Sequence, residues 1–598
     1  MRPYELLPMP APKDFDPSEE DPLFFYENFV KPLIPDMIQM MDVGLNIDQD
    51  AVEELRNTID TVLKSVSDRL EANPLVKQYQ NSRLPAAQKA HAEKATAALR
   101  TLDYYKQTYK PGDMVHRTWV VNEHLRRLMR QNDVQDKWTI KDLKQYNLFL
   151  GDPFFKAILD KRELSTNKHV HLAMESLAKH KLDLWNRPRL EKAETPVDLE
   201  PYNPGSSKQN SEFFAMMRVE PIAWSKDTGE ASWGRKQLEI IKNGTTDPDL
   251  LDVLEAMIDF SFSAIIKNNF LKAFDSFTID GVLHGNIKLF GAKSFRPTSN
   301  NPNLLNAPSS GSIYAKPLKR CLVAPDGRII YTADLSALED RVMANLSKDT
   351  NKMNIFLEGL DGHSLNSCVY FAEEIAEHMG PAPENNVPYI KEFYRLVEDE
   401  KHKELGLIRF NSKAPTFKLA YGGYPDADKG GVITQDIFDR YHNVLYPGIT
   451  RYREQYVLPS TKNNGYIHLG LGCRMYSAKP DEAIRTLNNA TVQFWSILTL
   501  IAINELNHRI RTQGMSSYMD VISTIYDSIY LSCDKDPEVI AWLNENIIEI
   551  MTMQYLEDEP IRNEASGDIG LNWADLHRVP NHATPDEIAK ILDTMYES

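Results

Sequence analysis

Apolar and polar positions follow a helical period through most of the first half of the chain. Apolar residues recur three and four positions apart over four ranges: 24–48, 52–70, 76–192 and 250–274. The clearest of these, VEELRNTIDTVLKSVSDRL at 52–70, predicts one long amphipathic helix. Proline and glycine interrupt the pattern at 110–112 and 151–153, and the turn-rich PYNPGSSKQ follows at 201–209.

Two short runs rich in β-branched residues lie in the second half of the chain. RIIYTADLS (328–336) predicts a strand that ends in Asp334, and VISTIYDSIYLSC (521–533) predicts two strands that meet near Asp527. The block between these runs is patterned mostly for helices. Carboxylates at strand ends, with helices inserted between the strands, favour an α+β fold built on an antiparallel sheet.

One helical stretch has a side chain pattern suited to a nucleotide. RFNSKAPTFKLAYG (409–422) places Arg409, Lys413, Phe417 and Tyr421 four residues apart, which puts them on one helix face. Two cations followed by two rings match the phosphates and then the base of a nucleoside triphosphate. The alternative is a surface helix with incidental regularity.

Asp334 and Asp527 are far apart in sequence but occupy equivalent places at strand ends. Two carboxylates brought together repel unless a cation lies between them. Mg²⁺ suits this position, because it binds one or two carboxylates together with substrate phosphates. The alternative for each aspartate alone is a turn or capping residue.

Composition restricts the class of protein. The 598 residues are 42% hydrophobic and 26% charged, without an apolar run long enough to span a bilayer or a secretory signal. The four cysteines lie far apart, which fits a reducing compartment and predicts a cytoplasmic protein. The length predicts several domains.

Charge is distributed unevenly. The net charge is −17, yet residues 76–192 hold 23 Lys and Arg against 13 Asp and Glu, which is +10 and leaves −27 for the rest. Such asymmetry indicates a polyanion-binding module attached to an acidic body. The alternative is a solvated helical surface.

Three segments carry a resemblance to a known family. TADLSALEDRVMANLSKD (332–349), RFNSKAPTFKLAYGG (409–423) and TIYDSIYLSCD (524–534) resemble motifs A, B and C of the family A DNA polymerases, typified by bacterial DNA polymerase I. The motif B pattern RxxxKxxxFxxxYG is met in full. Four further segments resemble family segments in the same order: FVKPLIPDMIQMMDVGLNID (29–48), FRPTSNNPNLLNAP (295–308), DGHSLNS (361–367) and RTLNNATVQ (485–493).

The resemblance implies a right-hand architecture: an antiparallel palm sheet, helical fingers, and a helical thumb with a large insertion. The expected domains are a leader and first palm segment at 1–48, the thumb at 49–275 with the basic insertion at about 76–198, palm at 276–338, fingers at 339–465, and palm with the C-terminal segment at 466–598.

The resemblance also implies a role for each matching residue. Asp334 and Asp527, with the Leu335 carbonyl, would hold two Mg²⁺ ions, with Mn²⁺ as an expected substitute. The residues expected at the incoming dNTP are Arg409, Lys413 and His363 at the triphosphate, Phe417 and Tyr421 near the bases, and Glu339 at the sugar 2′ position; Lys413 is also expected to act in catalysis. The residues expected at primer–template DNA are Arg296, Arg485, Asn489, Gln493 and Tyr526.

Several positions depart from the family pattern. Tyr526 stands where the family usually has His, and Ser528 where it usually has Glu, so two aspartates are left to carry both metals. Leu335 and Ala337 also replace the usual residues. Pro415 lies inside the motif B helix and is expected to bend it.

The expected function is template-directed DNA polymerisation by two-metal phosphoryl transfer, in bacteriophage genome replication in the host cytoplasm. Few residues precede the first matching segment, so we expect no proofreading exonuclease in this chain. A processivity factor or separate exonuclease subunit is expected to bind the 76–198 insertion or the leader. The alternatives are a single-subunit RNA polymerase, which Glu339 disfavours, and a catalytically silent DNA-binding scaffold.

Overall fold

The computed structural model describes residues 22–108, 199–225, 228–292, 294–308, 312–383, 386–420, 422–425, 433–476, 489, 491–554 and 559–597. The predictions for Tyr421, Arg485, the leader up to residue 21 and the basic stretch from 109 to 198 lie outside these residues. The chain forms two compact units, Met1–Thr61 with Ser263–Ser598, and Val62–Phe262. Among the described helices, none combines the length and apolarity that a bilayer crossing requires.

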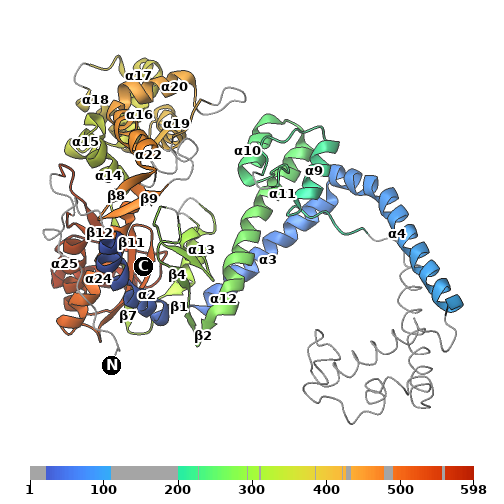
Figure 1. The fold of residues 1–598 in the computed structure, drawn as a ribbon, viewed down its shortest axis with the longest axis horizontal. Helices are drawn as coiled ribbons and strands as arrows, with labels where there is room; N and C mark the ends of the chain where they lie inside the picture. Colours follow the sequence, from blue (N-terminus) through green and yellow to red (C-terminus); the bar gives the residue numbers. More distant parts are fainter. Residues whose placement is uncertain are drawn as a thin grey trace, which may run out of the picture. The chain divides into compact units, whose positions relative to one another are not determined.

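An antiparallel sheet organises the first unit (Figure 1). Its strands, in spatial order, are β10 (Met519–Ile525), β11 (Ser528–Asp534), β7 (Arg328–Leu335), β12 (Ala565–Gly570) and β13 (His577–Val579). Helix α25 (Pro537–Met551) packs against β7, β11 and β12, while α2 (Lys31–Val43) and α24 (Ile497–Thr512) pack against β10. Because β7 lies in the middle of the sheet, five consecutive residues from Ile329 to Ala333 are buried.

The sheet confirms the α+β prediction. The predicted strand at 328–336 is β7, and the run at 521–533 forms β10 and β11 around a two-residue turn, in which Ile525 pairs with Ser528. The helical pattern at 24–48 is only partly helical, because it ends at Val43 and the chain continues as a strand. Gly44 makes the change with φ +68°, where a Cβ would lie 2.7 Å from Val282.

Smaller strand groups complete the first unit. The second sheet has the order β2 (Thr278–Ile279), β3 (Val282–Leu283), β1 (Leu45–Ile47) and β6 (Leu322–Val323). Two separate hairpins are β4 (Asn286–Lys288) with β5 (Thr298–Asn300), and β8 (Tyr466–Gly470) with β9 (Cys473–Tyr476).

A helical group lies between β7 and β8 in the sequence and gathers beyond the sheet in Figure 1. Its elements are α14 (Leu338–Ser347), α15 (Thr350–Leu357), α16 (Gly362–Tyr370), α17 (Ala372–Met379), α18 (Val387–Glu398), α19 (Lys403–Ala420), α20 (Gln435–Arg440), η5 (Tyr441–Leu445), α21 (Pro447–Tyr452), η6 (Arg453–Val457) and α22 (Leu458–Asn464). Helix α19 packs against α16 and α18, so the motif B helix is supported along its length.

The other described elements of the first unit are short helices around the sheets and the C-terminal helix. They are α1 (Pro22–Phe25), η2 (Tyr26–Val30), η3 (Ile266–Leu271), α12 (Lys272–Phe277), η4 (Leu304–Asn306), α13 (Ala315–Arg320), η7 (Phe494–Ser496) and α26 (Pro585–Glu597).

The second unit is helical. It contains α4 (Pro74–Thr108), α9 (Ser207–Met216), α10 (Arg235–Gly244) and most of α3 (Gln49–Ala72) and α11 (Pro248–Ile265). Its core holds the aromatic side chains of Tyr79, Tyr202 and Phe213, in edge contact with one another or tilted. The amphipathic pattern at 52–70 is confirmed as part of α3. The assignment of thumb, palm and fingers to the ranges given above stays a prediction.

Candidate active site

Sheet register brings the two predicted metal-binding aspartates to the same end of adjacent strands. Asp334 on β7 pairs with Ser528 on β11, and Asp527 occupies the turn just before Ser528. The backbone N–H of Leu335 donates to the carbonyl oxygen of Asp527 at 3.1 Å, which fixes the turn beside the end of β7. The prediction that these strand ends meet is therefore confirmed.

Burial makes this pair of carboxylates costly to ionise. Burial raises the pKa of Asp527 to about 6, with Glu339 and Asp334 adding to the rise and Arg296 opposing it. Burial also raises the pKa of Asp334, which the hydroxyl of Ser528 counteracts by donating to Oδ1 at 2.5 Å. The electrostatics favour a cation at this position.

The oxygen atoms present suit a divalent metal ion. Oδ1 of Asp527 is buried and has no hydrogen-bond partner among the residues that the structure describes. A buried carboxylate oxygen without a partner is costly, and a hard cation such as Mg²⁺ would satisfy it. Ser528, at the position where the family usually has Glu, supplies a hydrogen bond to Asp334 in place of a third carboxylate.

Residues predicted to touch DNA and the sugar form a connected group next to the carboxylates. Arg296 forms an ion pair with Glu339 on the first turn of α14. The Arg296 guanidinium also lies 5.3 Å from the ring centre of Tyr526, whose hydroxyl donates to Asn306 at 3.2 Å. Glu339 is thus held by Arg296, and Tyr526 adopts φ +53° at the hairpin turn, a left-handed conformation.

The cations of α19 differ in their partners. Arg409 forms two hydrogen bonds to Asp361, at 2.8 and 2.9 Å, and its side chain is only 16% exposed. Asp361 caps α16 by accepting from the backbone N–H of Ser364 at 2.7 Å. Burial acts to raise the pKa of Asp361, but Arg409 and Ser364 outweigh it and hold that pKa below its usual value.

Lys413 is not engaged in this way. It forms no ion pair with any residue in the described part of the chain. Burial lowers the pKa of the His363 imidazole, and the nearby positive charges of Lys413 and Arg409 lower that pKa further. The ring of His363 meets the ring of Phe417 edge-on, with centroids 5.9 Å apart. Phe417 is 55% exposed, which leaves its surface open to a ligand.

A cavity of about 360 Å³ opens among α14, α15, α16 and α19. The predicted residues that line it are Glu339, His363, Phe417 and Asn489. The structure therefore brings together residues from motif A, the 361–367 segment, motif B and the 485–493 segment around one space. Buried nitrogen and oxygen atoms of His363 (Nδ1) and Asn489 (Oδ1) lack partners among the described residues.

Among the lining residues that were not predicted from the sequence are Lys352 and Asp361. Lys352 is buried, pairs with Asp340 at 2.7 Å and lies 5.0 Å from the ring centre of Tyr446. Asp361, the partner of Arg409, lies in the DGHSLNS segment, where the spacing of Asp361 and Ser364 is a helix-capping signal that points to it. No local signal reveals the pairing of Lys352 with Asp340.

The remaining predicted residues have simpler positions. Leu335 ends β7 and is buried, and Gln493 is partly buried directly before η7. Pro415 is buried within α19, which continues through it from Lys403 to Ala420. Arg409, Lys413 and Phe417 share that helix, while Tyr421 and Arg485 lie outside the described residues.

Comparison with known proteins gives the same assignment as the motifs. A sequence profile for DNA polymerase family A matches residues 176–380. DNA polymerase I of Pseudomonas aeruginosa is 25% identical over 311 residues, which cover 50% of this chain and 30% of that protein. The thermostable DNA polymerase I of Thermus filiformis is 26% identical over 390 residues, covering 62% and 42%. The DNA polymerase of Mycobacterium phage D29 is 26% identical over 223 residues, covering 36% and 30%.

A solved structure shares the fold. It is the POL domain of Pol1 from M. smegmatis in complex with DNA primer-template and dNTP, which superposes with a TM-score of 0.51 and 22% sequence identity. The match covers 63% of this chain and 62% of that one. The chain spans less than half the length of the curated relatives named above. Profile, relatives and shared fold all show similarity to the DNA polymerases of family A.

Proposed function

We propose that the chain is a template-directed DNA polymerase that adds dNTPs to the 3′ end of a primer. One observation carries the proposal: the carboxylates of Asp334 and Asp527 lie at one end of the sheet, next to the cavity. Glu339 links the two places, because it raises the pKa of Asp527 and also lines the cavity with His363 and Phe417. In such a reaction the 3′ hydroxyl attacks the α-phosphorus of the dNTP, and pyrophosphate leaves.

Asp334 and Asp527 would hold two Mg²⁺ ions, with Mn²⁺ as a substitute and the Leu335 carbonyl as a further ligand. Bound divalent ions would stabilise the attacking and leaving oxygens during phosphoryl transfer. The carboxylate of Asp527, with a pKa near 6, is ionised at neutral pH and able to bind a cation. Ser528 keeps one oxygen of Asp334 oriented, and the turn bond from Leu335 fixes the position of Asp527.

The α19 residues would bind the incoming nucleotide. Lys413 is the cation available to the triphosphate, since it has no ion-pair partner in the described residues, whereas Arg409 must first give up Asp361. Phe417 offers an exposed ring for the base, and His363 lies beside it. Glu339 would crowd a ribose 2′ hydroxyl, while Arg296 and Tyr526 would contact the primer end and Asn489, Gln493 and Arg485 the template-primer duplex.

We also propose a role in bacteriophage genome replication. The similarity to the DNA polymerase of Mycobacterium phage D29 supports this role. The excess of 23 basic over 13 acidic residues at 76–192 supports binding of DNA or a processivity partner by that stretch.

Primer extension tests the proposal. The chain is expected to extend a labelled primer on a DNA template when Mg²⁺ and dNTPs are present, and to incorporate rNTPs at least about 100-fold less efficiently. Equal use of rNTPs would favour an RNA polymerase. Absence of extension, on a primer–template that a control polymerase does extend, would favour the DNA-binding scaffold instead. Incubation without dNTPs measures exonuclease activity, and shortening of the primer would contradict the expectation that this chain has no proofreading exonuclease.

A further inference from the structure

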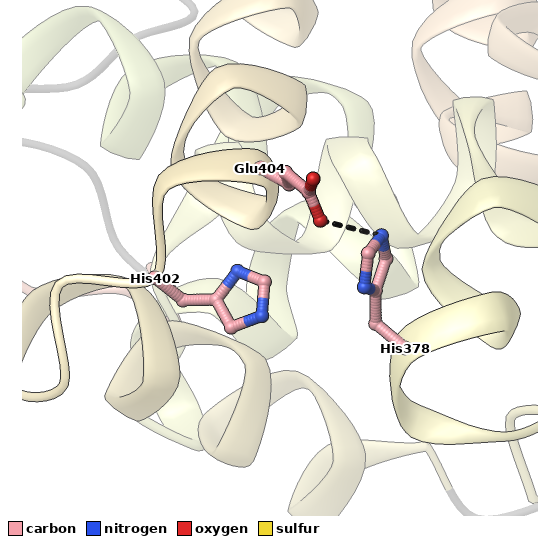
Figure 2. A group of neighbouring side chains, drawn as sticks. All are labelled: His378, His402 and Glu404. Atoms are coloured by element: carbon pink, nitrogen blue, oxygen red, sulfur yellow. Dashed lines mark ion pairs between the residues drawn. The ribbon is translucent and has the colours of Figure 1, made fainter.

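Three metal-ligating side chains meet on the helical group, outside the cavity described above. His378 lies in the last turn of α17, His402 directly precedes α19, and Glu404 lies in its first turn. Figure 2 shows both rings and the carboxylate directed toward a shared space. Two of the three ligands thus come from the start of the helix that carries Lys413 and Phe417.

The spacing of these side chains is close to that of a metal site. One potential ligand atom from each residue lies within 4.8 Å of the other two, and Nε2 of His378 is 3.6 Å from a carboxylate oxygen of Glu404. Bonds of about 2.0–2.1 Å in a tetrahedral zinc site place ligand atoms about 3.4 Å apart. Small rotations of surface side chains close that difference, because Glu404 is 72% exposed.

His402 is the most firmly placed of the three. Its backbone N–H donates to the Leu396 carbonyl at 3.0 Å, and its Nδ1 accepts from the backbone N–H of Leu405 at 3.3 Å. Coordination through Nδ1 would replace this capping bond, which is long and worth about 1 kcal/mol. The exchange favours the metal, because a zinc–imidazole bond is much stronger than one helix cap.

The surrounding charge favours a cation. Residues 373–378 and 398–404 hold seven carboxylates and two lysines. Arg395 and Arg409 neutralise part of this charge through Glu400 and Glu398. The segments still carry a net negative charge, which lowers the cost of placing a divalent ion between the two histidines.

We propose that His378, His402 and Glu404 bind a first-row transition metal ion, with Zn²⁺ the best match and a water molecule as fourth ligand. Two imidazoles and one carboxylate suit Zn²⁺, Co²⁺ or Ni²⁺, whereas Mg²⁺ prefers oxygen ligands alone. The ion ties the end of α17 to the start of α19. If the proposed polymerase function holds, this tie limits the movement of the nucleotide-binding helix and changes the KM for dNTP.

Direct metal binding tests the site independently of polymerase activity. The 598-residue chain, without an affinity tag and in excess Mg²⁺ to occupy Asp334 and Asp527, is titrated with Zn²⁺ by calorimetry and with Co²⁺ by visible absorption. One ion is expected per chain, with the absorption bands of tetrahedral Co²⁺. His378→Gln and Glu404→Gln are each expected to weaken binding more than about tenfold, at least as much as outer-shell changes do.

Two further variants separate ligation from folding. His402→Asn keeps a capping side chain but removes the imidazole, and it is expected to weaken binding as much as His378→Gln does. His508→Gln removes a partly buried histidine on α24 and is expected to leave the Kd within about twofold. Circular dichroism checks that each variant is folded. Absence of zinc binding by the parent chain, or equal affinity in all variants, would overturn the proposal; failure of primer extension would not.

Discussion

The carboxylate pair on the sheet and the cations on α19 obtain their positions in different ways. Asp334 and Asp527 are placed by backbone pairing, because strand register and a two-residue turn bring them together. Arg409 and Lys413 are placed four residues apart on one helix, yet side chain partners distinguish them. Arg409 is bound to Asp361, whereas Lys413 has no ion-pair partner in the described chain.

This contrast shows that the position of a side chain and its freedom to bind a ligand are set by different contacts. Backbone hydrogen bonds decide where a side chain begins, and they leave Asp527 with an unpartnered buried oxygen among the described residues. A long cationic side chain reaches several partners from one backbone position, so its role depends on which carboxylate lies nearby. Substitutions in the two regions should therefore affect activity and stability differently.

The largest effect is expected for Asp527→Asn. Loss of a metal ligand should lower the primer-extension rate by about 10³-fold or more, since metal ions supply several kcal/mol of transition-state stabilisation. The fold should persist, because the change removes a buried negative charge. Asp534→Asn, at the far end of β11, is the matched control and should retain activity. A rate within tenfold of the parent for Asp527→Asn would contradict the metal assignment.

Substitutions of the two cations of α19 should differ in their effects on activity and on stability. Lys413→Ala is expected to reduce kcat/KM for dNTP by about 10²-fold or more and to change the free energy of unfolding by less than about 0.5 kcal/mol. Arg409→Ala is expected to lower the free energy of unfolding by about 1–3 kcal/mol, because the partly buried Asp361 loses its partner. Urea denaturation and steady-state kinetics measure both. Equal stability losses in the two variants would show that Arg409 is not held as described.

The pH dependence should follow Asp527. Its pKa is raised to about 6, so protons compete with Mg²⁺ below that pH, and the half-saturating Mg²⁺ concentration should rise about tenfold per pH unit below 6. In the metal-free chain the same shift lowers stability as pH rises from about 4 through about 6, since the folded state binds the proton more tightly than the unfolded state does.

Asp527→Asn serves as the control for that measurement. The variant should abolish this part of the pH dependence of unfolding, measured by urea denaturation at a series of pH values. An unchanged profile would mean that another group titrates there.

The smallest effect is expected for Ser528→Ala. Removal of the hydroxyl that donates to Asp334 should raise the pKa of Asp334 further and slow extension about 2- to 10-fold, the value of one hydrogen bond. Ser528→Thr keeps the donor and should behave like the parent. Similar rates for the alanine and threonine variants would show that the bond has no role in activity.

The sequence by itself determined several of the elements and pointed to candidate site residues. Runs rich in β-branched residues located β7, β10 and β11, and a period of 3.6 located α3, because burial of one face or both faces of an element constrains the residues along it. The resemblance of three segments to motifs A, B and C, together with the 361–367 segment, pointed to Asp334, Asp527, Glu339, His363 and Phe417, and their roles stay predictions.

Tertiary structure decided which of these side chains are free to bind a ligand and which are held by other side chains. The pairings of Arg409 with Asp361, Arg296 with Glu339 and Lys352 with Asp340 join side chains whose approach depends on how separate helices pack. The metal cluster of His378, His402 and Glu404 has the same origin, because His378 reaches the other two only through the packing of α17 near the start of α19. The local sequence pattern does not predict such contacts, because they depend on how the folded elements pack and not on spacing along the chain.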